Sequence, residues 1–137
     1  MEKRILFVED DAGFREVFGH ALRQALREEM APERLDVAFV EAGSLAEARA
    51  RLRQGDLDAA LIDVTMPDGN GLDLVEEIHD GGPGTPIPTL VLTASLDTSV
   101  AGRAMEAGAM GALSKLASMP ETVDAIKGLT DAGRSEV

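Results

Sequence analysis

Three carboxylate side chains stand directly after apolar runs, where they could do chemistry. Glu9 and Asp10 follow "RILFV" at residues 4–8, and Asp63 ends "LDAALID" at residues 57–63. Carboxylates brought together repel one another, and either a raised pKa or a bound cation must relieve that cost. Oxygen ligands without thiolate or a paired histidine favour magnesium, which completes its coordination with water and phosphate oxygens. The pattern therefore predicts a magnesium site at which Asp63 is the nucleophile toward a phosphoryl group.

A hydroxyl and an amine occupy similar positions further along the chain. Thr93 lies in "PTLVLTA" at residues 88–94, and Lys115 follows a short apolar stretch that ends at Ser114. Lys115 would bring compact positive charge to the phosphoryl oxygens, and Thr93 would donate a hydrogen bond from the opposite side. Each group alone is typical of a surface lysine or a strand hydroxyl. Their joint placement with Asp63 indicates a site for phosphoryl transfer.

Alternating strand and helix patterns would position these groups. Besides the runs above, "LDVAFVEA" at residues 35–42 predicts a second strand, and Ala112–Ser114 predicts a short last one. Periodic apolar residues predict amphipathic helices between and after the strands. These residues are Phe14, Val17, Phe18, Ala21, Leu22 and Ala25; Leu45, Ala48 and Leu52; Leu72, Val75 and Ile78; Val100 and Ala104 in a helix from about Asp97 to Ala107; and Val123, Ile126 and Leu129.

Local signals mark the ends of several of these helices. Ser44 with Glu47, and Ser118 with Glu121, have the spacing of capping boxes. The "GGPG" stretch at residues 81–84 is typical of a helix stop followed by a loop. These signals support the boundaries that the apolar periodicity predicts.

The alternation predicts an α/β fold. Right-handed crossovers place helices on both faces of a parallel sheet, so we expect a five-stranded parallel sheet covered by helices on both faces. Ligands bind such sheets at the carboxyl ends of the strands, where the polar residues described above fall. A length of 137 residues fits one domain, expected over residues 1–131, with a frayed tail at residues 132–137.

Composition excludes several classes of protein. The chain has 13 basic and 25 acidic residues, and a net charge of −12 opposes binding to nucleic acid or to an anionic membrane. It has no cysteine, and nothing in it resembles a secretion signal or a membrane-spanning apolar stretch. A soluble cytoplasmic protein is the expectation. We interpret His20 and His79 as surface residues and not as a phosphoryl relay.

Four stretches, "ILFVEDD", "LIDVTMPDGNGLDL", "LVLTA" and "GALSK", carry these polar groups in order. Together they resemble the receiver (response-regulator) domain of two-component signal transduction, from about Arg4 to Leu129. The resemblance implies a doubly wound, flavodoxin-like sheet with the strand order 2-1-3-4-5. The resemblance implies that a sensor histidine kinase, or a phosphotransfer protein of a phosphorelay, donates a phosphoryl group to Asp63. It also implies signalling by conformational change, slow hydrolysis of the phosphoaspartate by the domain itself, and no enzymatic activity on a separate substrate. A homodimer is a further expectation for this family.

The resemblance assigns roles to individual residues. It implies that Mg²⁺ is bound by Glu9, Asp10, Asp63 and the backbone carbonyl of Thr65. Thr65 and Ser95 would flank the phosphorylation site and tune the rate of hydrolysis.

Two positions depart from the receiver pattern. The switch residue that works with Thr93 is usually aromatic and lies three positions before the lysine, but Ala112 stands there. The lysine is usually followed by a cis proline, whereas Leu116 follows it here, and a cis bond without proline costs about 2.5–4 kcal/mol. Because neither change removes a chemical group, we expect phosphorylation with a non-standard switch. The alternative is a degenerate receiver that binds proteins without being phosphorylated.

A phosphatase of the haloacid dehalogenase type also forms an aspartyl phosphate on a sheet of this kind. Such enzymes carry a second aspartate two residues after the nucleophile as general acid, and Thr65 has that position here. The nucleophile would also follow the third strand instead of the first. Turnover of free phosphomonoesters is therefore not expected.

Overall fold

A central parallel sheet with helices on both faces forms the structure. The computed structural model describes residues 2–29, 36–95 and 97–132. Its five-stranded sheet has the order β2-β1-β3-β6-β7, which in strand sequence is the expected order 2-1-3-4-5. The strands of this sheet are β1 (Glu2–Val8), β2 (Asp36–Ala42), β3 (Ala59–Asp63), β6 (Thr89–Thr93) and β7 (Ala112–Ser114).

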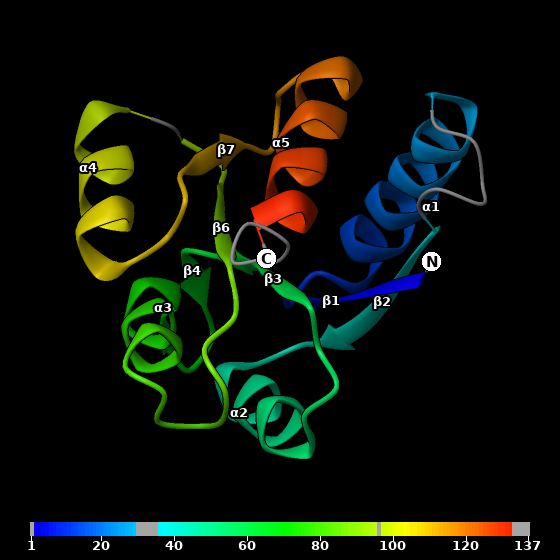
Figure 1. Ribbon diagram of the computed structural model, residues 1–137. Coiled ribbons are helices and arrows are strands. Elements are labelled where there is room, and N and C mark those ends of the chain that lie inside the picture. The colour runs from blue at the N-terminus through cyan, green and yellow to red at the C-terminus, as the bar shows by residue number, and fades with distance from the viewer. Residues whose placement is uncertain (1, 30–35, 96, 133–137) are drawn as a thin grey trace.

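The helices form two layers around this sheet (Figure 1). Helices α1 and α5 pack together on one face, and α3 contacts both α2 and α4 on the other. They are α1 (Ala12–Glu29), α2 (Leu45–Gln54), α3 (Gly71–His79), α4 (Thr98–Ala107) and α5 (Met119–Ala132). The expected doubly wound fold is therefore confirmed. Residues 133–137 of the expected frayed tail lie outside the described residues.

Apolar strands buried on both faces separate two hydrophobic clusters. Along β1, Ile5 and Phe7 belong to the cluster under α1 and α5, whereas Leu6 and Val8 belong to the cluster under α2, α3 and α4. This alternation follows from the two-residue period of side chains along a strand. Continuous apolar runs are therefore the pattern that a central parallel strand requires.

Most of the predicted helix faces are buried, with one exception in α1. Leu22 is fully buried, but Val17 is 70% exposed, so its assignment to the apolar face was wrong. Val17 comes one residue before Phe18, which packs against the α1/α5 cluster, and successive helical residues point about 100° apart. Leu26, which continues the row four residues after Leu22, is buried instead.

Capping accounts for the helix starts. Ser44 Oγ accepts from the N–H of Glu47 at 3.1 Å, and Ser118 Oγ accepts from the N–H of Glu121 at 3.3 Å, as the capping boxes predicted. The Glu47 carboxylate accepts a hydrogen bond of 2.6 Å from the N–H of Gly43. The two serine contacts satisfy amide groups that an α-helix leaves without partners in its first turn, whereas Gly43 precedes the N-cap of α2.

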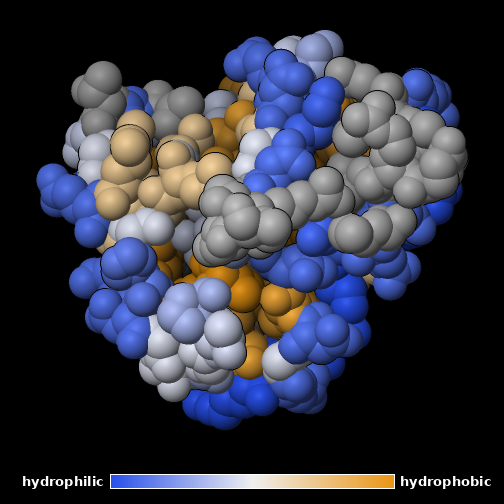
Figure 2. All heavy atoms as spheres, in the orientation of Figure 1, coloured by the Kyte–Doolittle hydropathy of each residue, from blue (hydrophilic) through white to orange (hydrophobic). Residues whose placement is uncertain are grey.

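Hydropathy is uneven over the surface. Figure 2 shows weakly hydrophobic residues over α4, at the upper left, and mainly hydrophilic residues over the neighbouring outer faces. Met105 on α4 is 61% exposed. None of the described helices is both long and apolar enough to cross a membrane.

Candidate functional site

Strand order and register bring the predicted polar residues to one edge of the sheet. Glu9 follows β1, and Asp63 is the last residue of β3. Val8 pairs with Ile62 in the parallel ladder, so the two carboxylates come next to each other at neighbouring strand ends. They line a cavity of about 500 Å³. Its walls also include Asp10, Asp11, Thr65, Met66, Pro67, Thr93, Ala94, Ser95 and Lys115.

The Lys115 ammonium lies between two buried carboxylates. Its Nζ is 2.6 Å from Oε1 of Glu9 and donates a hydrogen bond of 2.8 Å to Oδ2 of Asp63. Glu9 is 1% exposed and Asp63 is 4% exposed. Buried carboxylates require a nearby positive charge, because burial alone disfavours the ionised form. The lysine therefore provides charge compensation at the centre of the cavity.

The electrostatics of the site are set by burial and by this shared cation. Burial raises the pKa of Glu9 above its ordinary value, because it outweighs the contacts with Lys115 and the Asp11 N–H, and the charge of Asp63 acts in the same direction. Burial also opposes the charge of Lys115, but its contacts with Asp63 and Glu9 prevail and raise the lysine pKa. Lys115 is therefore a stable ammonium at neutral pH.

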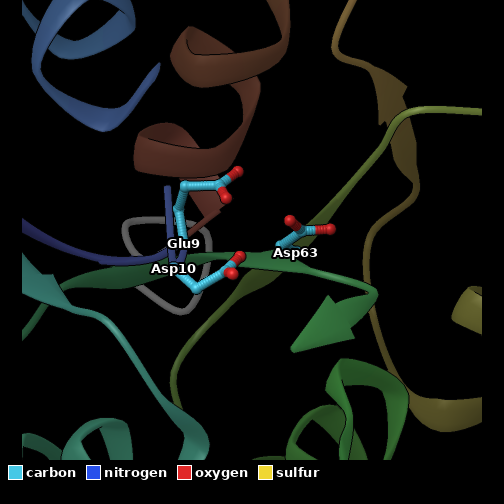
Figure 3. A group of neighbouring side chains, drawn as sticks. All are labelled: Glu9, Asp10 and Asp63. Carbon is cyan, nitrogen blue, oxygen red and sulfur yellow. The ribbon is translucent and has the colours of Figure 1, made fainter. Parts of the chain in front are cut away.

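The carboxylates of Glu9, Asp10 and Asp63 form the acidic group that the sequence predicted (Figure 3). Each residue offers one oxygen, and these oxygens lie within 4.8 Å of one another. Beyond its ion pair with Lys115, Glu9 Oε1 has no hydrogen-bond partner among the described residues. Asp10 is exposed, so the group opens to solvent on one side. Such a set of hard oxygen donors fits Mg²⁺.

Glu9 is held in place through its backbone as well as its side chain. Its N–H donates to the carbonyl of Ala42 on β2 at 3.0 Å, and its own carbonyl accepts from the Arg15 guanidinium. Arg15 also pairs with Glu41. The N–H of Asp11 donates to Glu9 Oε2 at 3.1 Å. Contacts from α1, β2 and the acidic turn thus fix the position of this carboxylate.

Asp11 has a different role from its acidic neighbours. Its Oδ1 accepts from the N–H of Phe14 at 3.0 Å, and its carbonyl accepts from the N–H of Arg15 at 2.9 Å. These are contacts of a residue that caps a helix start.

The chain leaves Asp63 through a small hairpin. Strands β4 (Thr65–Met66) and β5 (Gly69–Asn70) pair antiparallel. The N–H of Thr65 donates to Asp63 Oδ1 at 3.2 Å, a contact of the kind that aspartate makes at turns. Asp63 therefore both supports the turn that follows β3 and lines the cavity.

Asp68, at the tip of the hairpin, is a residue that sequence reasoning missed. Its carboxylate accepts from the N–H of Leu45 at 2.9 Å and of Ala46 at 3.0 Å. These bonds lower the pKa of Asp68. Asp68 therefore caps α2 from a distant part of the chain. Its place after Pro67 indicated only a turn, because nothing local reveals a partner so remote in sequence.

The remaining predicted residues lie around the rim. Thr93 is buried, and its hydroxyl contacts the backbone of Ser95, accepting from the N–H at 3.2 Å and donating to the carbonyl at 3.4 Å. Thr65 and Ser95 are exposed. Ala112 pairs with Val91 and packs against the cluster beneath α2, α3 and α4.

Two further expectations concern residues near or away from the cavity. The described residues contain no cis peptide bond, so Leu116 follows Lys115 through a trans bond. His20 and His79 are both exposed. Neither histidine lines the cavity.

Comparison with known proteins identifies relatives of the chain. Residues 5–127 match the family described as the response regulator receiver domain. The response regulator protein PilR of Pseudomonas aeruginosa is 33% identical over 113 residues, which cover 82% of this chain and 23% of PilR. The swarming motility regulation protein RssB of Serratia marcescens is 33% identical over 123 residues, which cover 90% of this chain and 51% of RssB.

A solved structure has the same fold. The CheY-like response regulator receiver domain protein of Methanospirillum hungatei is 25% identical, with a TM-score of 0.74 and coverage of 100% of both chains. Curated relatives are longer: the chain spans between 23% and 61% of the length of those that it matches.

Proposed function

Because this chain belongs to the response regulator receiver domain family, we propose that Asp63 accepts a phosphoryl group from a phosphohistidine of a sensor kinase or a phosphotransfer protein. The observation that carries the proposal is the pairing of one ammonium, that of Lys115, with the buried carboxylates of Asp63 and Glu9. A buried aspartate needs a cation beside it if its carboxylate is to remain ionised, and the ionised carboxylate is the form that can act as a nucleophile.

In the proposed step, a carboxylate oxygen of Asp63 attacks the phosphorus of the phosphohistidine. A phosphorus–oxygen bond forms, the phosphorus–nitrogen bond breaks, and the imidazole nitrogen leaves with the electron pair of that bond. The product is an acyl phosphate on Asp63 and a free histidine. The cavity of about 500 Å³ over the carboxylate supports this proposed transfer, because it leaves room for a phosphoryl group.

Lys115 would stabilise the charge that gathers on the phosphoryl oxygens. Its ammonium already lies 2.8 Å from Asp63 Oδ2, so it needs little rearrangement to reach an oxygen bound to that carboxylate. Preorganised positive charge of this kind is worth most in a site partly shielded from water. Thr93, buried beside the cavity, would add a hydroxyl donor once its contact with Ser95 is released.

Glu9, Asp10 and Asp63, with the backbone carbonyl of Thr65, would hold Mg²⁺. When bound, the cation offsets negative charge on the phosphoryl oxygens and on the clustered carboxylates. The cluster of carboxylate oxygens supports this assignment, as does Glu9 Oε1, whose one partner among the described residues is the Lys115 ammonium. The fixed backbone of Glu9 would keep its carboxylate oriented toward the site.

Hydrolysis would return the domain to its resting state. A water molecule would attack the phosphorus, and the bond between phosphorus and the Asp63 oxygen would break. Thr65 and Ser95, both exposed at the rim, would set how readily water reaches that point. In this proposal the protein catalyses only its own phosphorylation and dephosphorylation.

The output of the domain would depend on a non-standard switch. Ala112 offers only a methyl group where the family usually has an aromatic ring, and it packs against the apolar cluster beneath α4. A signal would therefore travel by movement of the Thr93–Ser95 loop and α4. The same observation favours the second candidate function, a module that binds proteins without phosphorylation.

The partners follow from the same proposal. The donor would be a histidine kinase or phosphotransfer protein, and a homodimer is the expected assembly. The net charge of −12 supports the view that this domain does not itself bind nucleic acid.

Intact-mass spectrometry after incubation with acetyl phosphate and magnesium tests the proposal. The wild type should gain one phosphoryl group, and chelation of magnesium should prevent the gain. Asp63→Asn should gain none, whereas Asp73→Asn, which changes an exposed aspartate in the first turn of α3, should behave as wild type. The assignment fails if the wild type gains no mass or if Asp63→Asn gains as much.

A further inference from the structure

All four phenylalanines of the chain lie in one continuous row of ring contacts. Phe14 stacks on Phe18 with ring centroids 5.2 Å apart and planes 13° from parallel. Phe18 contacts Phe7 at 5.6 Å, and Phe7 contacts Phe39 at 5.6 Å. The row thus runs from α1 through β1 to β2, and Phe14 forms its end.

The free end of this row meets the candidate site. Nζ of Lys115 lies over the ring of Phe14, 4.9 Å from its centroid. The face of an aromatic ring carries partial negative charge and attracts a cation within about 6 Å. The Lys115 ammonium therefore has three neighbours that favour its charge: Glu9, Asp63 and the Phe14 ring.

The ring of Phe14 is oriented by contacts that do not involve the lysine. The N–H of Phe14 donates to Asp11 Oδ1 at 3.0 Å, which fixes its backbone at the start of α1. Stacking on Phe18 fixes the plane of its ring, and Phe18 is in turn held by the fully buried Phe7. The ring is thus a rigid surface, whereas a lysine side chain is long and flexible.

We propose that Phe14 is a positioning residue of the phosphoryl-acceptor site, which holds the Lys115 ammonium between Glu9 and Asp63 through the face of its ring. This role rests on the proposed function. Phosphorylation converts one partner of the ammonium, the Asp63 carboxylate, into an acyl phosphate. The ring contact takes no part in the bond changes, so it can keep the ammonium in place before and after transfer.

The ε-methylene protons of Lys115 test the contact directly. A ring face shifts nearby protons upfield, so their NMR signal in the wild type should lie upfield of the other lysines. Phe14→Leu should return the signal to the ordinary lysine range. Phe39→Leu removes the ring at the other end of the same row, which stacks on neither Phe14 nor Lys115, and it should leave the signal upfield. This measurement requires no phosphorylation, so its outcome is separate from that of the acetyl phosphate experiment.

The rate of phosphorylation by acetyl phosphate tests the role. Loss of a cation–π contact of ordinary strength predicts a rate about three- to tenfold lower in Phe14→Leu. Phe14→Tyr keeps the ring and should retain both the upfield signal and the rate. Phe39→Leu should react at close to the wild-type rate, since its ring contacts Phe7 at the far end of the row from the lysine.

Several results would overturn the role of Phe14. They are a wild-type Lys115 signal in the ordinary range, a signal unchanged in Phe14→Leu, and a rate that falls as far in Phe39→Leu as in Phe14→Leu. If Phe14→Leu does not fold, Phe14→Met serves as the second variant, because methionine fills the space with a longer apolar side chain that has no ring. The Lys115 signal of the wild type alone also decides whether the contact exists. A wild type that shows the upfield signal but no phosphorylation would contradict the proposed function instead.

Discussion

Gly71, the first residue of α3, is pressed against the backbone of Asp63. A Cβ atom on Gly71 would lie 1.9 Å from the Asp63 carbonyl oxygen and 3.0 Å from Cγ2 of Ile62. The N–H of Gly71 also donates to the carbonyl of Val64 at 2.7 Å. The start of α3 thus packs directly on the strand end that presents the proposed phosphoryl acceptor, and only glycine fits there.

Gly71→Ala should therefore destabilise the protein. The added methyl group must push α3 away from the end of β3, and overpacking of this kind costs about 1–3 kcal/mol of unfolding free energy. Because the displaced backbone carries Asp63, phosphorylation should also slow. Urea unfolding and the acetyl phosphate reaction measure the two effects.

Gly102→Ala provides the control for that substitution. Gly102 lies within α4, and a Cβ there would meet nothing within 4 Å. The unfolding free energy of Gly102→Ala should stay the same or rise by up to about 1 kcal/mol, since alanine favours helix more than glycine does. If Gly71→Ala proves as stable as Gly102→Ala, the close approach to Asp63 has no energetic importance.

Asp68→Asn should change the dependence of stability on pH. Two backbone N–H groups lower the pKa of Asp68, so its contribution is present above the ordinary aspartate pKa and is lost as pH falls through the lower, folded-state pKa. Asparagine keeps one carbonyl acceptor but loses the second acceptor and the charge at the α2 start. The variant should thus be less stable than wild type at neutral pH, and the difference should shrink on acidification.

Urea unfolding of both proteins over a pH series measures this difference. Asp124→Asn removes an exposed charge from α5 and controls for the change in net charge. A stability gap for Asp68→Asn that stays constant from neutral to acidic pH would contradict the role of the Asp68 carboxylate as a charged cap.

Arg15→Met should weaken the binding of Mg²⁺ without removing a metal ligand. Arg15 donates to the carbonyl of Glu9 and pairs with Glu41, so it holds the backbone that carries a proposed ligand. Loss of a group that orients a metal ligand typically lowers affinity about ten- to hundredfold. A magnesium titration followed by the amide NMR signals of Asp10 and Asp11 gives the affinity.

Arg49→Met is the matched control for that titration. Arg49 makes two hydrogen bonds of 2.8 Å to Glu77, which link α2 to α3, and it does not line the cavity. Its side chain is 30% exposed, compared with 17% for Arg15, so both variants break a partly shielded pair of the same type. Equal magnesium affinities in the two variants would show that Arg15 has no special relation to the site.

Much of the fold could be predicted from short stretches of the sequence. Ala112–Ser114 forms β7 as its apolar pattern indicated, and the box at Ser118 and Glu121 caps α5. Such features depend on neighbours within a few residues, which the sequence presents side by side. The assignment of Val17 to the buried face of α1 was wrong because apolar spacing alone does not show which side of a helix packs against the sheet.

By itself, the sequence determined that Glu9, Asp63 and Lys115 would share one edge of the sheet, because residues that end parallel strands meet at the same edge. Only the tertiary structure decided which groups touch. The Lys115 ammonium lies between the two carboxylates and against the ring of Phe14, and the carboxylate of Asp68 caps the start of α2. These contacts join residues far apart in the chain, so they follow from the packing of α1 and the hairpin around the sheet and not from any local pattern.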